Sequence, residues 1–261
     1  MTEVQTIQSL SAAGQVEGQV LAGGTLLMRQ VNYAPQEVPK ILRITDPAFR
    51  QIGRVGGQVS LGAGVSMSQV IAAPELAALA PAARAIGGPA IRNMATVGGN
   101  LFAPHPYGDF TTALLAIGAQ VQWADGRTED IEVFLANRAN ARGVVAAVLI
   151  DPPRGEALRF AKVARTKPKG VSVLSIAVLI NGSGRQVLSA RITFGAMGAT
   201  PLRAKAAEAA LAGATLDVGG VAAACAACTN DLNPADDALA SAWYRREVAP
   251  IHLRRLLLGE T

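Results

Sequence analysis

The length and composition of the chain limit the classes of protein to which it can belong. Half of its 261 residues are hydrophobic and 16% are charged, which is typical of a folded protein with extensive burial and not of a disordered one. The net charge of +5 comes from 24 basic and 19 acidic residues. Because the basic residues are scattered and are not interleaved with aromatic ones, we expect no nucleic-acid binding. The two cysteines are too few for a four-cysteine iron–sulfur site or a zinc ribbon.

The first residues and the longest apolar run indicate in which cellular compartment the protein is expected. MTEVQTIQSL lacks the basic region and apolar block of a secretory signal. The run VSVLSIAVLI at 171–180 is too short to span a bilayer and is typical of a buried strand. We therefore expect a cytoplasmic protein without a transmembrane segment.

The first third of the chain predicts a small β-α-β unit followed by a hairpin and helices. VEGQVLAGGTLLMRQVN (16–32) predicts a strand, a tight glycine turn and a helix that begins near Thr25, and KILRIT (40–45) predicts a second strand. Residues 53–72 predict a hairpin and a helix that starts at Ser66 or Ser68. Residues 73–87 predict a helix with Pro74 in its first turn and a break at Pro81.

The rest of the chain predicts an antiparallel sheet and then helices. Residues 110–133 suggest a short helix and a hairpin closed by Asp125-Gly126, and GVVAAVLIDPP (143–153) a buried strand. Residues 157–204 contain strand-like segments with turns at KPKG (167–170) and NGSG (181–184). From Ala204 onward the pattern is helical, with breaks at the glycines 213 and 219–220 and at the proline 234.

Two glycine pairs are candidates for a phosphate-binding site. Gly23-Gly24 is followed directly by Thr25, and Gly98-Gly99 follows two residues after Thr96. A glycine pair lets successive backbone N–H groups face one concavity, because no Cβ blocks the approach of an oxyanion. Two such turns facing each other could hold a pyrophosphate. The chain has no G-x-G-x-x-G strand-to-helix turn and no G-x-x-x-x-G-K-[ST] motif, which argues against the Rossmann and P-loop modes.

The segments that carry these glycines resemble those of a known family. LAGGTLLM (21–28) and IRNMATVGGNLFAPHPYGDFTTALLAIGA (91–119) are similar to the two flavin-binding segments of the FAD-binding medium subunit of molybdenum hydroxylases, the xanthine dehydrogenase and carbon monoxide dehydrogenase family. FAKVAR (160–165) and residues 236–257 resemble later parts of the same subunit. The resemblance implies an α+β fold of the PCMH type, with a β-α-β subdomain at 1–55, a mainly antiparallel subdomain at 56–157 and a C-terminal α+β subdomain at 158–261.

The resemblance also implies which residues hold FAD. The first turn would wrap the pyrophosphate with backbone N–H groups, the second would form a facing nest, Asp109 would accept from a cofactor hydroxyl, and Lys162 would approach the flavin. A cation there would stabilise the reduced, anionic flavin. The implied cofactor-binding residues are Leu21, Ala22, Gly23, Gly24, Thr25, Leu26, Thr96, Gly98, Gly99, Asn100, Asp109 and Lys162. No catalytic residue and no metal ligand is expected in this chain.

Several residues have structural alternatives, and two depart from the family pattern. Asp109 could cap the following helix, Lys162 could be an exposed strand lysine, and His105 could make a local hydrogen bond in its loop. Leu26 stands where many members have Asp, and TKPKGVS (166–172) lacks an acidic residue that is usual there. Outside the binding segments, two cysteines, Cys225 and Cys228, are interpreted as small buried side chains on one helical face, with a redox pair as the alternative.

The implied function is electron relay. In the family, a large subunit hydroxylates the substrate at a molybdopterin cofactor, a small subunit carries two [2Fe-2S] clusters, and the FAD subunit delivers the electrons to NAD+, oxygen or a quinone. The resemblance implies a dimer of heterotrimers that acts on an aldehyde, a purine, an N-heterocycle or carbon monoxide. A flavin-free scaffold subunit, a stand-alone flavin oxidase of the vanillyl-alcohol-oxidase type and a plain nucleotide-binding module are the alternatives.

Overall fold

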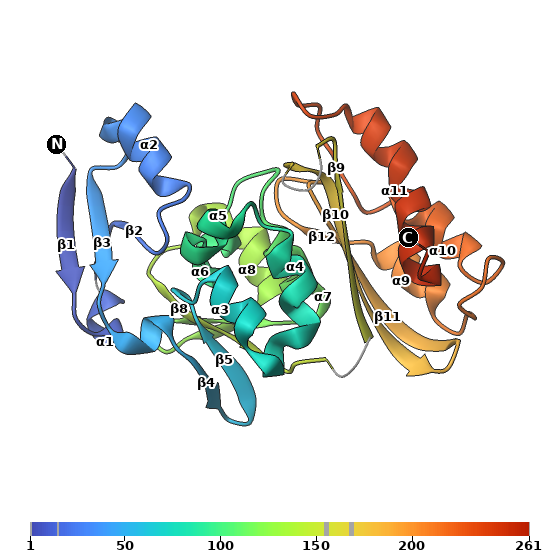
Figure 1. The fold of residues 1–261 in the computed structure, drawn as a ribbon, viewed down its shortest axis with the longest axis horizontal. Helices are drawn as coiled ribbons and strands as arrows, with labels where there is room; N and C mark the ends of the chain where they lie inside the picture. The colour runs from blue at the N-terminus through green and yellow to red at the C-terminus, as the bar shows by residue number, and fades with distance from the viewer. Residues whose placement is uncertain (1, 15, 154–156, 167–169, 261) are drawn as a thin grey trace.

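Three β-sheets lie side by side along the long axis of the molecule, each with its own helices (Figure 1). The computed structural model describes residues 2–14, 16–153, 157–166 and 170–260. Within these residues no helix combines the length and the apolar character that crossing a membrane requires. The predicted KPKG turn at 167–170 lies largely outside the described residues.

The first sheet is parallel, with strand order β1-β3-β2. The sequence predicts its two later strands and its helix but not β1. The helix α2 begins at Leu27 and not at Thr25, although the Met28 N–H donates to the Gly24 carbonyl over 2.9 Å, so one helical turn reaches back to the glycine pair. The elements are β1 (Glu3–Ile7), α1 (Leu10–Ala13), β2 (Gln19–Val20), α2 (Leu27–Tyr33), the 3-10 helix η1 (Pro35–Glu37) and β3 (Lys40–Ile44).

The second sheet is antiparallel, with strand order β4-β5-β8-β6-β7. The 3-10 helix η2 (Pro47–Arg50) precedes it in the chain. Its strands are β4 (Ile52–Val55), β5 (Gln58–Gly62), β6 (Gln120–Trp123), β7 (Thr128–Asp130) and β8 (Val145–Ile150). The helices associated with it are α3 (Met67–Ala72), η3 (Pro74–Leu79), α4 (Ala80–Arg84), α5 (Pro89–Met94), α6 (Val97–Leu101), α7 (Asp109–Ala116), α8 (Ile131–Asn137) and η4 (Arg138–Asn140).

Local signals explain where these helices begin. Ser66, and not Ser68, caps α3, because its hydroxyl accepts from the Gln69 N–H while the Gln69 side chain accepts from the Ser66 N–H. The predicted break at Pro81 corresponds to a change of helix: the 3-10 helix η3 ends at Leu79 and α4 begins at Ala80. Pro81 lies in the first turn of α4, where a proline needs no N–H partner.

The third sheet is antiparallel, with strand order β12-β11-β10-β9. The buried run at 171–180 is confirmed as part of β10, which continues through Ser183, so the hairpin turn falls at Gly184 and Arg185 and not across all of NGSG. The elements are β9 (Leu158–Ala164), β10 (Ser172–Ser183), β11 (Gln186–Gly195), β12 (Leu202–Arg203), α9 (Lys205–Leu211), α10 (Ala222–Ala227) and α11 (Ala242–Leu258).

Helix α7 lies at the seam between the second and third sheets. All of its residues are buried, and its apolar side chains belong to the core shared by the first two sheets. Thr112 faces the third sheet, where its hydroxyl lies 3.3 Å from that of Ser175 and its carbonyl accepts from Thr193 over 2.8 Å. A second core lies between the third sheet and helices α9 to α11. The position of α7 therefore depends on both halves of the chain.

Candidate functional site

The structure brings the two predicted glycine turns together. A Cβ built at Gly23 would overlap the backbone carbonyl of Met94, so Gly23 lies directly against the connection between α5 and α6. Thr96 follows two residues later as the N-cap of α6. Residues more than seventy positions apart in the sequence thus form one surface.

The first turn presents unused backbone donors. Leu21 continues the pairing with β3, because its N–H donates to the Leu42 carbonyl over 2.9 Å, and Gly24 has a φ of 73°, which favours glycine. The N–H groups that follow donate to no other residue that the structure describes; they belong to Ala22, Gly23, Gly24, Thr25 and Leu26. A run of adjacent unpaired N–H groups is the arrangement that binds an anion.

The second turn is the first turn of helix α6 and not the predicted tight glycine turn, and its N–H groups already have acceptors. Gly98 donates to the Ala63 carbonyl over 2.7 Å, and Gly99 donates to the Thr96 hydroxyl over 3.1 Å. A Cβ at Gly98 would lie 2.8 Å from that of Ala63, whereas a Cβ at Gly99 would meet only the Thr96 Oγ1, at 3.0 Å. Gly98 therefore serves packing, and Gly99, which is exposed, leaves a face open to a close-approaching group.

Asn100 connects the second turn to α7. Its Oδ1 accepts from the N–H of Thr111 over 2.8 Å and from the Thr111 hydroxyl over 2.9 Å. Both residues are buried. The oxygen of Asn100 thus fixes the start of α7 relative to α6, and with it the position of Asp109.

Asp109 and Lys162 form a largely buried ion pair. The Lys162 Nζ lies 2.9 Å from Asp109 Oδ2 and also donates to the Ala85 carbonyl over 2.8 Å, while Ser172 donates to Asp109 Oδ1 over 2.6 Å. The Lys162 side chain is only 14% exposed, so it is not an exposed strand lysine. Asp109 is the first residue of α7 and Gly108 is the N-cap. The Asp109 charge therefore lies in the first helical turn, where a negative charge is favourable.

The sequence does not indicate Ser172 or Asp237 as partners of the binding segment. Ser172 lies 63 positions from Asp109, and Asp237 lies 132 positions from His105. Ser172 does lie in the segment that departs from the family pattern, and Asp237 in the C-terminal segment that resembles it. Pairing across such distances is set by the fold, so spacing alone could not reveal it.

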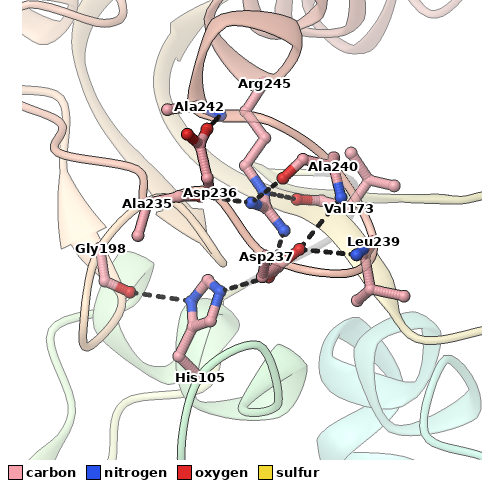
Figure 2. A network of polar contacts seen from close by, with 10 residues as sticks. All are labelled: His105, Val173, Gly198, Ala235, Asp236, Asp237, Leu239, Ala240, Ala242 and Arg245. Atoms are coloured by element: carbon pink, nitrogen blue, oxygen red, sulfur yellow. Dashed lines mark hydrogen bonds and ion pairs between the residues drawn. The ribbon is translucent and has the colours of Figure 1, made fainter.

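His105 makes long-range hydrogen bonds to the C-terminal part of the chain (Figure 2). Its Nδ1 lies 3.2 Å from the Gly198 carbonyl oxygen, and its Nε2 lies 2.9 Å from Asp237 Oδ2. The favoured prediction, a local hydrogen bond within the loop, is therefore wrong, because both partners lie more than ninety positions away along the chain. The same Asp237 oxygen accepts from Arg245, which is fully buried.

The cysteines have the properties of packing residues. Both are free thiols, and burial, with the neighbouring Cys225 thiol, raises the pKa of Cys228 to about 12. Burial also raises the pKa of Cys225. Because the thiolate is the reactive form, this favours the structural interpretation. Among the described residues no group of His, Cys, Asp and Glu could hold a metal ion.

Comparisons with known proteins bear on the family and the fold. A family model described as "FAD binding domain in molybdopterin dehydrogenase" matches residues 2–148, and one described as "CO dehydrogenase flavoprotein C-terminal domain" matches residues 159–259. The carbon monoxide dehydrogenase from Hydrogenophaga pseudoflava that lacks the Mo-pyranopterin moiety of its molybdenum cofactor superposes with a TM-score of 0.87 at 27% identity, covering 98% of this chain and 96% of that chain.

Two curated proteins are similar over part of their length. The nicotinate dehydrogenase FAD-subunit of Eubacterium barkeri is 28% identical over 185 residues, which are 63% of this chain and 62% of the relative. The carbon monoxide dehydrogenase medium chain of Hydrogenophaga pseudoflava is 32% identical over 121 residues, 43% of this chain and 42% of the relative. Each match thus spans less than two thirds of the relative.

The first family model alone covers more than half of the chain, and the three-sheet fold confirms the α+β architecture that the sequence predicts. The chain therefore belongs to the FAD-binding medium subunits of the molybdenum hydroxylases, an oxidoreductase family.

Proposed function

We propose that this chain binds one FAD non-covalently and is the electron-transfer subunit of a molybdenum hydroxylase. The observation that carries the proposal is the first glycine turn, which has unpaired N–H groups and packs at Gly23 against the segment leading into Thr96. A pyrophosphate needs such unpaired donors on a surface that its oxygens can approach closely. Membership of the FAD-binding family supports the same conclusion.

The proposed role of each residue follows from its unpaired hydrogen-bond donors, its open face or its charge. The first turn supplies backbone donors to the pyrophosphate, and the open face at Gly99 lets it approach the second turn. Asn100 acts by holding α6 to α7. Lys162, with Asp109 as its counter-ion, supplies the positive charge near the flavin. The proposed cofactor-binding set is Leu21, Ala22, Gly23, Gly24, Thr25, Leu26, Thr96, Gly98, Gly99, Asn100, Asp109 and Lys162.

The partners and the reaction are proposed by analogy with the relatives. FAD accepts electrons singly and releases them in pairs, which suits it to a position between one-electron clusters and a two-electron acceptor. We propose a large molybdopterin-binding subunit and a small subunit with two [2Fe-2S] clusters, assembled as a dimer of heterotrimers in the cytoplasm. The substrate would be an aldehyde, a purine, an N-heterocycle or carbon monoxide, and the acceptor NAD+, oxygen or a quinone.

The decisive experiment is an absorption spectrum of the protein purified with its native partners, followed by acid release and identification of the flavin. We expect FAD near one per chain, together with iron and molybdenum in the partner chains. Flavin without iron and molybdenum would favour a stand-alone oxidase.

A flavin-free scaffold is the second candidate. The observation that favours it is the ion pair between Asp109 and Lys162, because each charge is already neutralised within the chain without a cofactor. An intact complex containing iron and molybdenum but no flavin would overturn the first proposal and establish the second.

A further inference from the structure

The loop at 102–108, between α6 and α7, connects the two parts of the proposed FAD site. Asn100 precedes the loop and Asp109 follows it, so its position sets the spacing between the second glycine turn and the Asp109–Lys162 pair. Arg138, in η4, ties this loop to Ala199 of the C-terminal part of the chain. Arg138 donates to the carbonyls of Leu101 and Ala103 and, through its other terminal nitrogen, to that of Ala199.

His105 is the loop residue with the most informative contacts. Its Nδ1 faces the Gly198 carbonyl and its Nε2 faces the Asp237 carboxylate. A carbonyl oxygen and an ionised carboxylate can only accept hydrogen bonds. A neutral imidazole has a single N–H, so only the doubly protonated ring can donate to both partners at once.

The surroundings of the ring keep Asp237 ionised. Burial by itself raises the pKa of the Asp237 carboxyl, but hydrogen bonds from His105, from the Ala240 and Leu239 N–H groups and from Arg245 outweigh it and hold the pKa well below its usual range. Arg245 is anchored separately, by donating to the carbonyls of Val173, Ala235 and Ala240 (Figure 2). The charged groups that face the ring are thus Asp237 directly, Arg245 behind the same oxygen, and Arg138 along the loop.

We propose that His105 is a positioning residue for the FAD site, whose two hydrogen bonds, made together only by the protonated ring, couple the position of the 102–108 loop to pH. This inference rests on the proposed function, since it assigns to the loop an effect on the cofactor. When the ring loses a proton, one of the two hydrogen bonds must break, and the loop is then held from one side of the ring only.

The first test measures the protonation of the ring without using the cofactor. The chain has only two histidines, so 15N-histidine labelling gives two ring spin systems, which a His252→Gln variant assigns. At about pH 5.5, below the range in which imidazoles titrate, we expect both His105 ring nitrogens to carry a proton and to show the chemical shifts of an imidazolium. A His105 ring with one unprotonated nitrogen at that pH would overturn the proposal.

The second test follows FAD release by the rise in flavin fluorescence, between about pH 5.5 and pH 8.5, on either side of the range in which imidazoles titrate. In the unaltered full chain we expect release to become about tenfold faster towards the upper end, the effect of one lost hydrogen bond. His105→Gln should release FAD at the faster rate at every pH. His252→Gln should keep the profile of the unaltered protein.

The outcomes separate this inference from the proposed function. If the unaltered chain holds no FAD at any pH, the proposed function fails, while the first test still reports on the ring. If FAD is bound but the unaltered chain and His105→Gln show the same pH profile of release, the proposed function stands and His105 has no positioning role.

Discussion

At the scale of single residues, Gly99 separates cofactor binding from folding. Its missing Cβ faces open space apart from the Thr96 hydroxyl, so Gly99→Val places a branched side chain where the pyrophosphate is proposed to approach. We expect FAD binding to weaken at least about tenfold, or ~1.4 kcal/mol, while the free energy of unfolding changes by no more than about 1 kcal/mol. Equilibrium dialysis with FAD and urea unfolding measure the two effects.

A matched control for this variant is Gly53→Val. A Cβ at Gly53, in β4, also meets nothing within 4 Å, and a β-branched residue suits a strand. The control should keep its FAD. Stoichiometric FAD in folded Gly99→Val would show that the second turn does not contact the cofactor.

The Asp109–Lys162 pair predicts an unequal response to mutation. Lys162→Met leaves the nearly buried Asp109 carboxylate with Ser172 as its remaining side-chain donor, and we expect a loss of about 3 kcal/mol in the free energy of unfolding. The double variant Lys162→Met/Asp109→Asn should recover part of that loss, because no charge is then left buried. Urea unfolding of the single and double variants measures it.

The same variant tests the flavin role of Lys162. Loss of a nearby cation should lower the reduction potential of the bound flavin, because the reduced anion is then less stabilised. An unchanged reduction potential would show that Lys162 does not act on the flavin. Its ion pair with Asp109 would then have a structural role alone.

At the scale of secondary-structure elements, the contact between the first turn and the α5–α6 connection leaves no room for a side chain. Even a methyl group at Gly23 would overlap the Met94 carbonyl, and backbone cannot move aside as a flexible side chain can. We expect Gly23→Ala to cost about 3 kcal/mol in the free energy of unfolding. Gly53→Ala serves as the control in the same urea titration, and equal stability of the two variants would contradict the observed packing.

Elements that are determined by neighbouring residues in the sequence were predictable. Elements that depend on pairing with distant parts of the chain were not. The capping residue Ser66, the hairpin at Asp125-Gly126 and the buried strand at 171–180 follow from short-range signals. The strand β1 carries no such signal, and it is stabilised by pairing with β3, far along the chain. The same limit applies to the site, where the glycine turns could be proposed but the use of the Gly98 N–H could not. The subdomain boundaries at 55/56 and 157/158 stay predictions.

At the scale of the whole molecule, the His105–Asp237–Arg245 contacts join the 102–108 loop to the C-terminal part. The folded Asp237 carboxyl has a lowered pKa, whereas an unfolded one titrates near about 3.9. Its stabilising effect is therefore fully present above that pH and is lost as the pH falls below it. We expect the urea midpoint of the unaltered chain to fall more steeply from pH 6 to pH 3 than that of Asp237→Asn. Parallel curves would assign acid sensitivity to other carboxylates.

The packing of the glycines also limits what the family motif can tell about flavin content. Gly23 and Gly98 are required by their neighbours, the Met94 carbonyl and Ala63, whether or not a cofactor is present. A descendant that had lost FAD would still need both glycines in order to fold, so their presence alone is a poor diagnostic of a flavoprotein. Gly99 has no such constraint from the backbone of its neighbours. In any similar chain, therefore, the residue at that single position is the more informative marker of whether flavin is still bound.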